Sequence, residues 1–419
     1  MKIAVWHNLP SGGGKRALYN HVRGLIGRGH NVKSWCPSTA DISYQDIGDL
    51  LTENVMPFSW PEYKNNNRVL EFLGKYKHSV KKIETMDRHC RICADEISRE
   101  KFDVLFANSC MFYRVPSIAR YVKVPKIIYL QEPYRWLYEA MPRLPWVALD
   151  APDNRRFSWT YAKQFVRDLS DVQALRVQAR EELLSAKYFD NILVNSLFSR
   201  ESILRAYGLN SEVCYLGIDT GLFHNKHVKK EHSIVGIGAF VPEKNIDLVI
   251  QSIGKTKKPR PHLIWIGNMV NKTYLQRLTA MAESLDVDFR PLIKIADSDI
   301  VNILNQSKAM VYAPRLEPFG FAPLEANACG LPVIAVAEGG VRETIIDNVN
   351  GLLVKHDSQA IAEAINRILC NDSYAQQLGE SGEKIVNNKW SLEKSIDRIE
   401  NCLLELISDN SIKSNRQDL

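Results

Sequence analysis

Two glutamates of this chain are spaced so that they could act on one ligand. Glu317 and Glu325 enclose seven residues in the string EPFGFAPLE, which continues ANACGLPVIAVAEGG. The string predicts a loop, a short helix and a buried β-strand, in that order. Glu317 would precede the helix, and Glu325 would lie about two turns into it. A ligand bound here would therefore meet a carboxylate at each end.

The turn at Phe319, Gly320 and Phe321 is where this helix is expected to begin. The first N–H groups of a helix have no partner within the helix, and the helix dipole adds a partial positive charge there. Such an end suits a phosphate or an electron-rich sugar oxygen. A sugar nucleotide, with its sugar hydroxyls, diphosphate and ribose diol, fits two carboxylates with amide donors between them. For either glutamate alone, a solvated helix start is the alternative interpretation.

The whole string closely resembles the signature of the retaining, nucleotide-sugar-dependent glycosyltransferases of the GT-B fold. This large family, the glycosyl transferases group 1, includes bacterial mannosyl- and glucosyltransferases. In the family, the first glutamate contacts the donor sugar and the second holds the nucleotide ribose. The resemblance implies a catalytic role for Glu317 and a donor-binding role for Glu325. It implies further donor contacts by Phe319, Gly320, Phe321 and Leu324.

A second motif, GAFVPEKNID at residues 238–247, follows the first expected strand of the second half, where a turn from strand to helix faces a ligand. Lys244 could act there as a compact positive charge on a diphosphate, and we interpret it as catalytic. The family usually carries an arginine directly after the donor-binding Gly238, but this chain has Ala239. Loss of one donor to the leaving diphosphate would cost about 3 kcal/mol unless it is replaced. Arg315, in the loop before the first glutamate, is the candidate substitute.

A glycine run, Gly12, Gly13 and Gly14, lies between the first expected strand and a helix and is followed by Lys15. Glycines permit positive φ angles and let the backbone approach a ligand closely. The spacing matches neither GxGxxG nor GxxxxGK[ST], so neither a dinucleotide fingerprint nor a P-loop is supported. We expect this loop of the N-terminal domain to touch the donor phosphate or the acceptor. A plain flexible loop is the alternative.

Gln131 and Glu132 follow a strand expected at Lys126–Tyr129. Many family members place a histidine there, close to the donor sugar, and neither of these residues titrates like histidine. Either could hydrogen-bond a sugar hydroxyl. Glu132 is interpreted as an acceptor-side contact or, equally, as a carboxylate at a helix start.

The composition is that of an ordinary globular protein, with 45% hydrophobic and 24% charged residues. The net charge of +6 is a mild excess that does not by itself indicate nucleic-acid binding. Cys90 and Cys93 form the only CxxC pair, so a zinc site is not expected. We expect no metal, no bound cofactor and a metal-independent reaction. No apolar stretch approaches the roughly 20 residues of a membrane span, and we expect a cytoplasmic protein with reduced thiols.

Short apolar runs alternate with amphipathic stretches along the chain, which predicts an α/β fold with parallel sheets. The length of 419 residues fits two doubly wound, Rossmann-like domains that face each other across a cleft, as in GT-B. We place an acceptor-side domain at 1–215, a linker at 216–231 and a nucleotide-sugar donor domain at 232–389. The resemblance implies that a helix at 390–408 crosses back to the first domain, and 409–419 is expected to be a disordered tail.

The expected strands of the first half are Ile3–Trp6, Val32–Trp35, Val104–Ala107, Lys126–Tyr129 and Asn191–Asn195. Its expected helices are Lys15–Gly27, Ser79–Glu100 and Glu181–Lys187. The expected strands of the second half are Ser233–Ile237, His262–Ile266, Val287–Phe289, Ala309–Tyr312, Val333–Val336 and Gly351–Val354.

Aromatic and basic residues mix in two stretches, 60–82 and 136–163. Segments of this kind can lie on an anionic membrane, where many relatives find lipid-linked acceptors. Peripheral contact with the inner face of the membrane is therefore an expectation, and buried aromatics with solvated charges are the alternative.

Together these features predict a retaining glycosyltransferase that moves a hexose from a nucleotide diphosphate sugar to a hydroxyl acceptor, such as a glycan, glycolipid or lipid-linked saccharide. A sugar-nucleotide epimerase or a phosphorylase on the same fold is the alternative among enzymes, because a fold alone does not fix a reaction. A nucleotide-sugar-binding protein without turnover is the alternative from another class.

Overall fold

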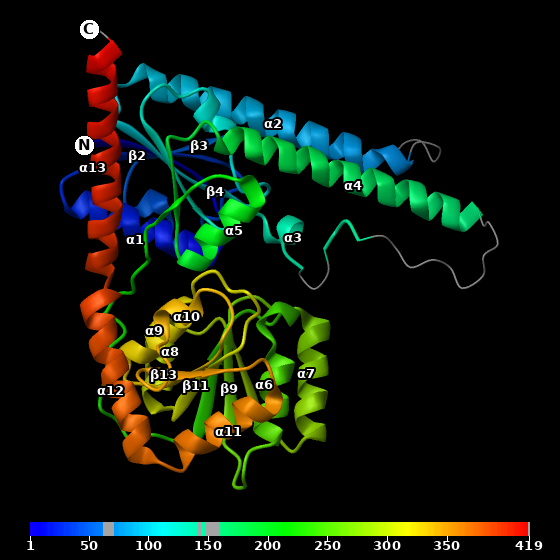
Figure 1. The fold of residues 1–419 in the computed structure, drawn as a ribbon, viewed down its shortest axis with the longest axis vertical. Helices are drawn as coiled ribbons and strands as arrows, with labels where there is room; N and C mark the ends of the chain where they lie inside the picture. Colours follow the sequence, from blue (N-terminus) through cyan, green and yellow to red (C-terminus); the bar gives the residue numbers. More distant parts are fainter. Residues whose placement is uncertain (62–70, 141–143, 148–158, 418–419) are drawn as a thin grey trace. The chain divides into compact units, whose positions relative to one another are not determined.

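The computed structural model (Figure 1) describes residues 1–61, 71–140, 144–147 and 159–417. It divides the chain into two compact units. The first comprises residues 1–195, 199–214 and 396–419, and the second comprises residues 196–198 and 215–395.

The first unit is built on a parallel sheet in the order β3-β2-β1-β4-β5-β6-β7. Its strands are almost entirely buried where helices cover both faces, which is why β1 and β4 read as nearly continuous apolar runs. The strand bounds are β1 Lys2–Asn8, β2 Asn31–Pro37, β3 Glu53–Met56, β4 Val104–Cys110, β5 Lys126–Gln131, β6 Asn191–Val194 and β7 Glu212–Val213.

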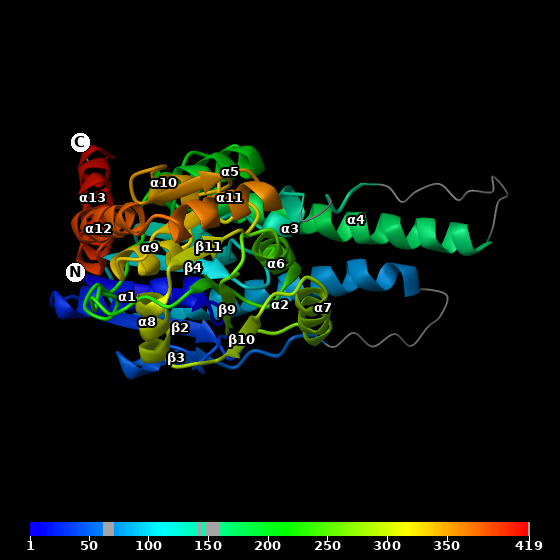
Figure 2. The ribbon, with the colours of Figure 1, turned by 90° about the horizontal axis from the view of Figure 1, so that it is seen from below.

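In the described part of the first unit, helices follow these strands, and two of them are much longer than predicted. They are α1 Gly13–Gly27, α2 Glu71–Arg99, α3 Arg135–Tyr138, α4 Trp159–Ala186 and α5 Leu197–Tyr207, which belongs to this unit from Ser199 onward. Figures 1 and 2 show α2 and α4 lying side by side and extending well beyond their own sheet. The sequence predicted only the parts nearest the sheet, because the outer turns lack a clear apolar stripe.

The second unit has a parallel sheet in the order β10-β9-β8-β11-β12-β13. The strand order reverses between β8 and β11, so the carboxyl ends of these neighbours flank a topological switch point. The strand bounds are β8 Ser233–Ile237, β9 His262–Gly267, β10 Phe289–Ile293, β11 Ala309–Tyr312, β12 Val333–Val336 and β13 Gly351–Val354. The helices are α6 Ile246–Gly254, α7 Lys272–Ser284, α8 Asp297–Gln306, α9 Phe321–Ala328, α10 Val341–Thr344, α11 Ser358–Leu369 and α12 Asp372–Lys389.

The predicted pair of doubly wound parallel-sheet units, the architecture of GT-B, is confirmed. Three strands differ from the prediction. The sequence missed β3 and β7, two edge strands with polar residues, and it placed β10 two residues too early. β10 contains Pro291 and exposed Arg290, which an edge strand tolerates and an apolar-run search overlooks.

The final helix, α13 Leu392–Gln417, belongs to the first unit from Ile396 onward. Its contacts include an ion pair between Arg28 Nη2 and Asp397 Oδ1 at 2.6 Å. A second contact joins His30 Nε2 and Glu400 Oε1, also at 2.6 Å. The helix continues to Gln417, through residues 409–417 of the tail that the sequence predicted to be disordered. The stretch Ser408–Gln417 contains no glycine or proline that would end a helix.

The segment predicted as a linker, 216–231, contains no helix or strand and packs within the second unit. Leu216, Ile218 and Phe223 are buried there. The N–H of Ile218 donates to the carbonyl of Trp390 at 2.9 Å, which ties the segment to the end of α12.

Candidate functional site

Lys244 and Glu317, predicted from separate motifs, form an ion pair in the second unit. Lys244 Nζ donates to Glu317 Oε2 at 2.8 Å, and each side chain is 23% exposed. Lys244 lies in the turn after β8, and Glu317 lies in the loop after β11. Because β8 and β11 are neighbours, their carboxyl ends bring the two charges together.

Gly238 gives the Lys244 side chain its room at the end of β8. A Cβ on this glycine would lie 3.2 Å from Lys244 Cγ and 3.3 Å from its Cδ. Directly after the lysine, Asn245 adopts a left-handed φ of 51° and starts α6, and its Nδ2 donates to the carbonyl of Ala313 at 2.8 Å. The turn is therefore fixed to the end of β11 by a side chain that follows the lysine.

Two glycines after β12 hold the loop that carries Glu317. The N–H of Gly340 donates to the carbonyl of Glu317 at 2.8 Å. A Cβ on Gly340 would lie 2.0 Å from the carbonyl oxygen of Pro318, and one on Gly339 would lie 2.3 Å from that of Glu317. Leu316 has a φ of 50°, an unusual angle for a side-chain-bearing residue that these contacts maintain. No role was predicted for these glycines, although a glycine pair often marks a place where two backbone segments approach closely.

The turn before α9 is compact and requires a glycine at position 320. Gly320 has a φ of 89°, and a Cβ there would lie 2.7 Å from the hydroxyl of Tyr312. Phe319 is buried against Trp390, with ring centroids 5.7 Å apart, and lies edge-on to Phe321 at 5.8 Å. Ser196 donates through Oγ to the carbonyl of Pro318 at 2.5 Å. The start of α9 is thus rigidly placed, and its first N–H groups have no acceptor within the helix.

Glu325 is the fifth residue of α9, a little more than one turn from its start rather than the predicted two. Its side chain is only 4% exposed. The side chain of Leu324 is fully buried, so this residue could meet a ligand only through its backbone. Burying a carboxylate to this extent is costly unless it interacts with a polar or charged group.

Arg315 forms an ion pair with the loop that follows β12. Its Nε donates to Glu338 Oε2 at 2.6 Å, and half of its side chain is exposed.

The glycine loop of the first unit lies next to Gln131. Gly12 precedes α1 with a φ of 141°, and Gly13 and Gly14 are the first residues of the helix. A Cβ on Gly14 would lie 3.2 Å from Gln131 Nε2. Gln131 itself has a φ of 65° at the end of β5. Two predicted contacts thus meet at the carboxyl edge of this sheet.

Glu132 is held by two arginines. Arg114 Nη2 lies 3.0 Å from Glu132 Oε1, and Arg135 Nε lies 3.5 Å from Oε2. Its carboxylate is therefore charge-compensated within the first unit, beside Gln131.

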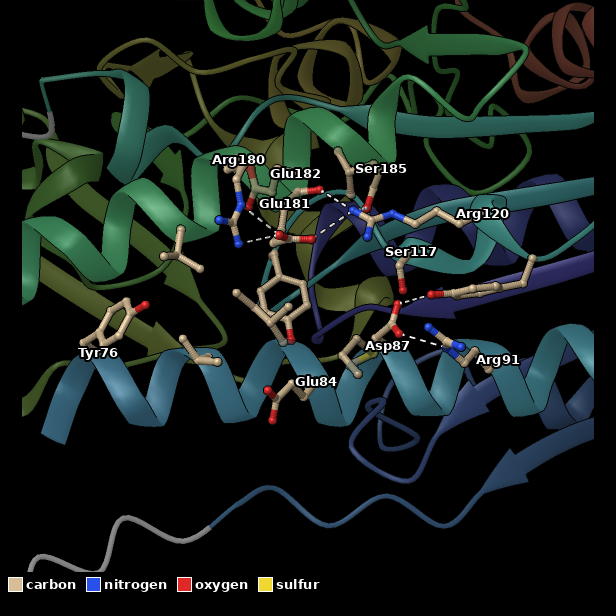
Figure 3. Close-up of a pocket in the computed structure, with 17 residues that line it drawn as sticks. Tyr76, Glu84, Asp87, Arg91, Ser117, Arg120, Arg180, Glu181, Glu182 and Ser185 are labelled. Carbon is tan, nitrogen blue, oxygen red and sulfur yellow. Dashed lines mark hydrogen bonds and ion pairs between the residues drawn. The ribbon is translucent and has the colours of Figure 1, made fainter. Parts of the chain in front are cut away.

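A cavity of about 330 Å³ lies between α2 and α4 and contains none of the predicted site residues (Figure 3). The charged groups along it largely pair with one another. Arg120 Nη2 lies 3.1 Å from Glu181 Oε2, and the Tyr121 hydroxyl donates to Asp87 at 2.5 Å. Burial raises the pKa of Glu182, the most enclosed acid of the lining.

One group in the described part of the chain has the geometry to hold a metal: His7, Cys36 and Glu53 in the first unit. Burial lowers the pKa of His7. Burial raises the pKa of Glu53, but the hydrogen bond with His7 and the charge of Lys15 bring it below its usual value. The predicted CxxC cysteines, Cys90 and Cys93, are buried free thiols that do not belong to this group.

None of the helices in the described ranges combines the length and the apolar composition that crossing a membrane requires.

Residues 219–385, which contain Lys244, Glu317 and Glu325, match the family model of glycosyl transferases group 1. This part of the chain is a glycosyl transferases group 1 domain. The predicted family resemblance is therefore confirmed on the unit that carries the Lys244–Glu317 pair.

Relatives of this chain include an uncharacterized glycosyltransferase of Methanocaldococcus jannaschii, 29% identical over 53% of this chain and 58% of that protein. Another is the human alpha-1,3/1,6-mannosyltransferase ALG2, 26% identical over 52% of this chain and 59% of ALG2. The chain thus spans a little under three fifths of the length of these curated relatives.

Solved structures with the same fold include the sucrose-phosphate synthase of Thermosynechococcus elongatus, with a TM-score of 0.69 and 17% identity over 98% of this chain and all of that one. HepE of Anabaena, solved with UDP-glucose, gives a TM-score of 0.65 and 17% identity over 97% of this chain and all of that one. The likeness to both structures concerns the fold.

Proposed function

We propose that this protein is a glycosyltransferase that transfers a hexose from a nucleotide diphosphate sugar to a hydroxyl acceptor with retention of the anomeric configuration. The observation that carries the proposal is the ion pair between Lys244 and Glu317 at the carboxyl edge of the second sheet, inside the group 1 domain. Both groups suit the donor: an ammonium for the diphosphate and a carboxylate for sugar hydroxyls.

Each residue has a distinct role in the proposed reaction. Lys244 stabilises the negative charge that develops on the leaving diphosphate. Glu317 positions the sugar, and the start of α9 offers backbone N–H groups to the diphosphate. Glu325, buried in α9, accepts hydrogen bonds from the ribose diol. In the proposed route the acceptor attacks on the face that the diphosphate leaves, and a phosphate oxygen takes its proton.

The carboxyl edge of the second sheet also offers apolar surface for a nucleotide base. Met269 follows β9 and Ile293 ends β10, and their side chains are 57% and 46% exposed. The sheet order β10-β9-β8 places Met269 next to the end of β8, which precedes the turn with Lys244, and places Ile293 one strand further out. A nucleotide base that packs against these side chains would lie beyond the diphosphate, on the side away from the sugar.

We further propose that the acceptor is lipid-linked and that the outer part of α4 touches an anionic membrane. Trp159, Phe165 and Leu169 are 79%, 51% and 53% exposed on this helix. Lys163 and Arg167, between them, are also exposed. Exposed apolar side chains interleaved with basic ones favour the surface of an anionic bilayer.

The basic residues of α2 contribute less to this proposed membrane-binding surface than the sequence indicated. Lys77 and Lys81 are exposed, but Lys82 Nζ packs over the ring of Trp60 at 5.0 Å. Other residues of the two basic, aromatic stretches, including Arg155 and Arg156, lie outside the described residues.

The proposed reaction can be tested with isotope-labelled UDP-, GDP- and ADP-sugars offered together with membrane lipid extract. A labelled glycolipid and an equal amount of released nucleoside diphosphate are expected with one class of donor, and NMR of the product should show the donor's anomeric configuration. Inversion would contradict the retaining route. Nucleotide binding without product would favour the non-catalytic alternative.

A further inference from the structure

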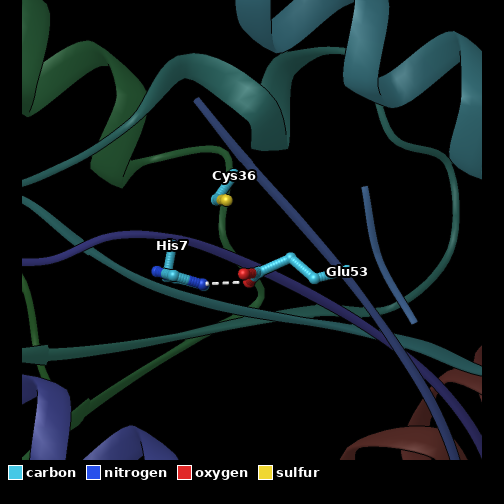
Figure 4. A group of neighbouring side chains, drawn as sticks. All are labelled: His7, Cys36 and Glu53. Carbon is cyan, nitrogen blue, oxygen red and sulfur yellow. Dashed lines mark hydrogen bonds and ion pairs between the residues drawn. The ribbon is translucent and has the colours of Figure 1, made fainter. Parts of the chain in front are cut away.

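Three neighbouring strands of the first unit place an imidazole, a thiol and a carboxylate together on one face of the sheet (Figure 4). His7 lies on β1, Cys36 on β2 and Glu53 on β3. In the strand register Trp6 pairs with Trp35 and Ser34 pairs with Glu53, so His7 stands beside Cys36.

The three potential ligand atoms lie within 4.8 Å of one another. His7 and Cys36 are fully buried, and the Glu53 side chain is 4% exposed. His7 Nε2 and Glu53 Oε1 are hydrogen-bonded at 2.7 Å, and Ser34 Oγ donates to the same oxygen at 3.1 Å. His7 Nδ1 is buried and has no hydrogen-bond partner among the described residues. The His7 imidazole is thus oriented with Nε2 toward the Glu53 carboxylate.

We propose that His7, Cys36 and Glu53 form a binding site for a divalent transition metal of the zinc class. Imidazole, thiolate and carboxylate are the donors that Zn²⁺ takes in proteins, whereas Mg²⁺ and Ca²⁺ prefer oxygen atoms alone. The Cys36 thiol releases its proton to solvent as the sulfur–metal bond forms. In the absence of an ion, the His7–Glu53 hydrogen bond satisfies two of the same groups. The proposal uses no residue of the proposed transfer site.

A buried lysine adds a positive charge beside this cluster. Lys15, the third residue of α1, is fully buried, and its Nζ has no hydrogen-bond partner in the described ranges. Its ammonium acts electrostatically on His7, Cys36 and Glu53, so it lies near all three. Without a metal, Lys15 balances the charge of Glu53. With a metal it is a like charge close to the ion, and it weakens binding.

The test uses the full chain, freed of metals with a chelator and titrated with Co²⁺, which reports thiolate ligation by a sulfur-to-cobalt charge-transfer band. One equivalent of Co²⁺ per chain should produce this band, and Zn²⁺ should displace it. Cys36→Ser should abolish the band, with folding checked by circular dichroism. Cys370→Ser is the matched control, because Cys370 is the exposed thiol of the chain and the natural adventitious ligand.

Lys15→Met provides a test that does not depend on losing a ligand. Removing the like charge should tighten Co²⁺ binding by about tenfold or more. A folded wild-type chain that gives no charge-transfer band with Co²⁺ would overturn the proposal. So would a band that persists in folded Cys36→Ser or disappears in Cys370→Ser. Since neither readout involves a sugar nucleotide, failure of the transfer reaction would leave this result unaffected.

Discussion

Lys244 Nζ and Glu317 Oε2 lie 2.8 Å apart, although 73 residues separate them in the chain. The pair joins the ends of β8 and β11, the two strands beside the switch point of the second sheet. A bound diphosphate would compete with Glu317 for the ammonium, and the hydroxyls of a sugar would compete with Lys244 for the carboxylate. In the proposed reaction the pair would hold each charge in place until a ligand that matches both arrives.

Removing the ammonium should slow the transfer step. We expect Lys244→Ala to lower kcat/KM by at least about 100-fold, because the leaving diphosphate loses a cation whose effect is largest in the transition state. Lys257→Ala is the control, since Lys257 is an exposed lysine near the opposite edge of the same sheet. Full activity in Lys244→Ala would remove this lysine from the mechanism and return attention to Arg315.

Glu325 should recognise the ribose diol. Glu325→Ala is expected to weaken the binding of a nucleoside diphosphate by about 1.5–3 kcal/mol, or roughly 10- to 150-fold, because a charged acceptor of two hydroxyls is lost. Calorimetry with the 2′-deoxynucleotide separates this contact from a general disturbance of α9. The wild type should bind the deoxynucleotide more weakly than the ribonucleotide, and Glu325→Ala should bind both alike. Equal discrimination by both proteins would refute the assignment.

The docking of α13 in the first unit should depend on the absence of a side chain at Gly24. A Cβ there would lie 2.4 Å from Ile396 Cδ1 and 2.5 Å from its Cγ1. Gly24→Ala is therefore expected to lower the free energy of unfolding by about 1–3 kcal/mol. Gly27→Ala, in the same helix with no heavy atom within 4 Å, should be neutral or stabilising by up to about 1 kcal/mol. Equal free energies of unfolding for the two variants, measured by denaturant titration, would contradict this close packing.

The exposed face of α4 should bind anionic vesicles. The protein is expected to co-sediment with anionic vesicles. Added salt should reduce this binding, and binding to neutral vesicles should be negligible. Phe165→Ser with Leu169→Ser should reduce it, as should Lys77→Glu with Lys81→Glu, by at least about tenfold at about 1 kcal/mol per charge. Ile346→Ser, an exposed apolar residue of the second unit, is the control. Equally weak sedimentation with both lipids at low salt would favour a soluble acceptor.

Much of the fold was predictable because parallel strands are buried on both faces. β11, β12 and β13 begin and end where the sequence placed them, since each is a short apolar run bounded by turn residues. The outer turns of α2 and α4 could not be predicted, because helices that project from their sheet bury little and keep no stripe toward a core.

The motifs name the residues of the candidate site, but the contacts among these residues could not be predicted from the sequence. Two separate motifs assigned Lys244 and Glu317 to one ligand without showing that they contact each other. The support from Ser196 and the glycines after β12 depends on backbone contacts between distant segments, which leave little trace in residue type. The His7, Cys36 and Glu53 cluster was missed for a similar reason: its members lie on three strands, and β3 was not recognised.

The central claim, that this chain binds and uses a nucleotide diphosphate sugar, is tested most directly by a thermal-shift panel of UDP-, GDP- and ADP-sugars. At a hundredfold excess over Kd, the matching donor should stabilise the second unit by about 2.7 kcal/mol and raise the melting temperature of that unit by about 5–10 °C. The shift should shrink in Glu325→Ala and Lys244→Ala, and free hexose should produce none. A folded wild-type protein that shows no shift with any nucleotide sugar, and none with the free nucleoside diphosphates, would contradict the account.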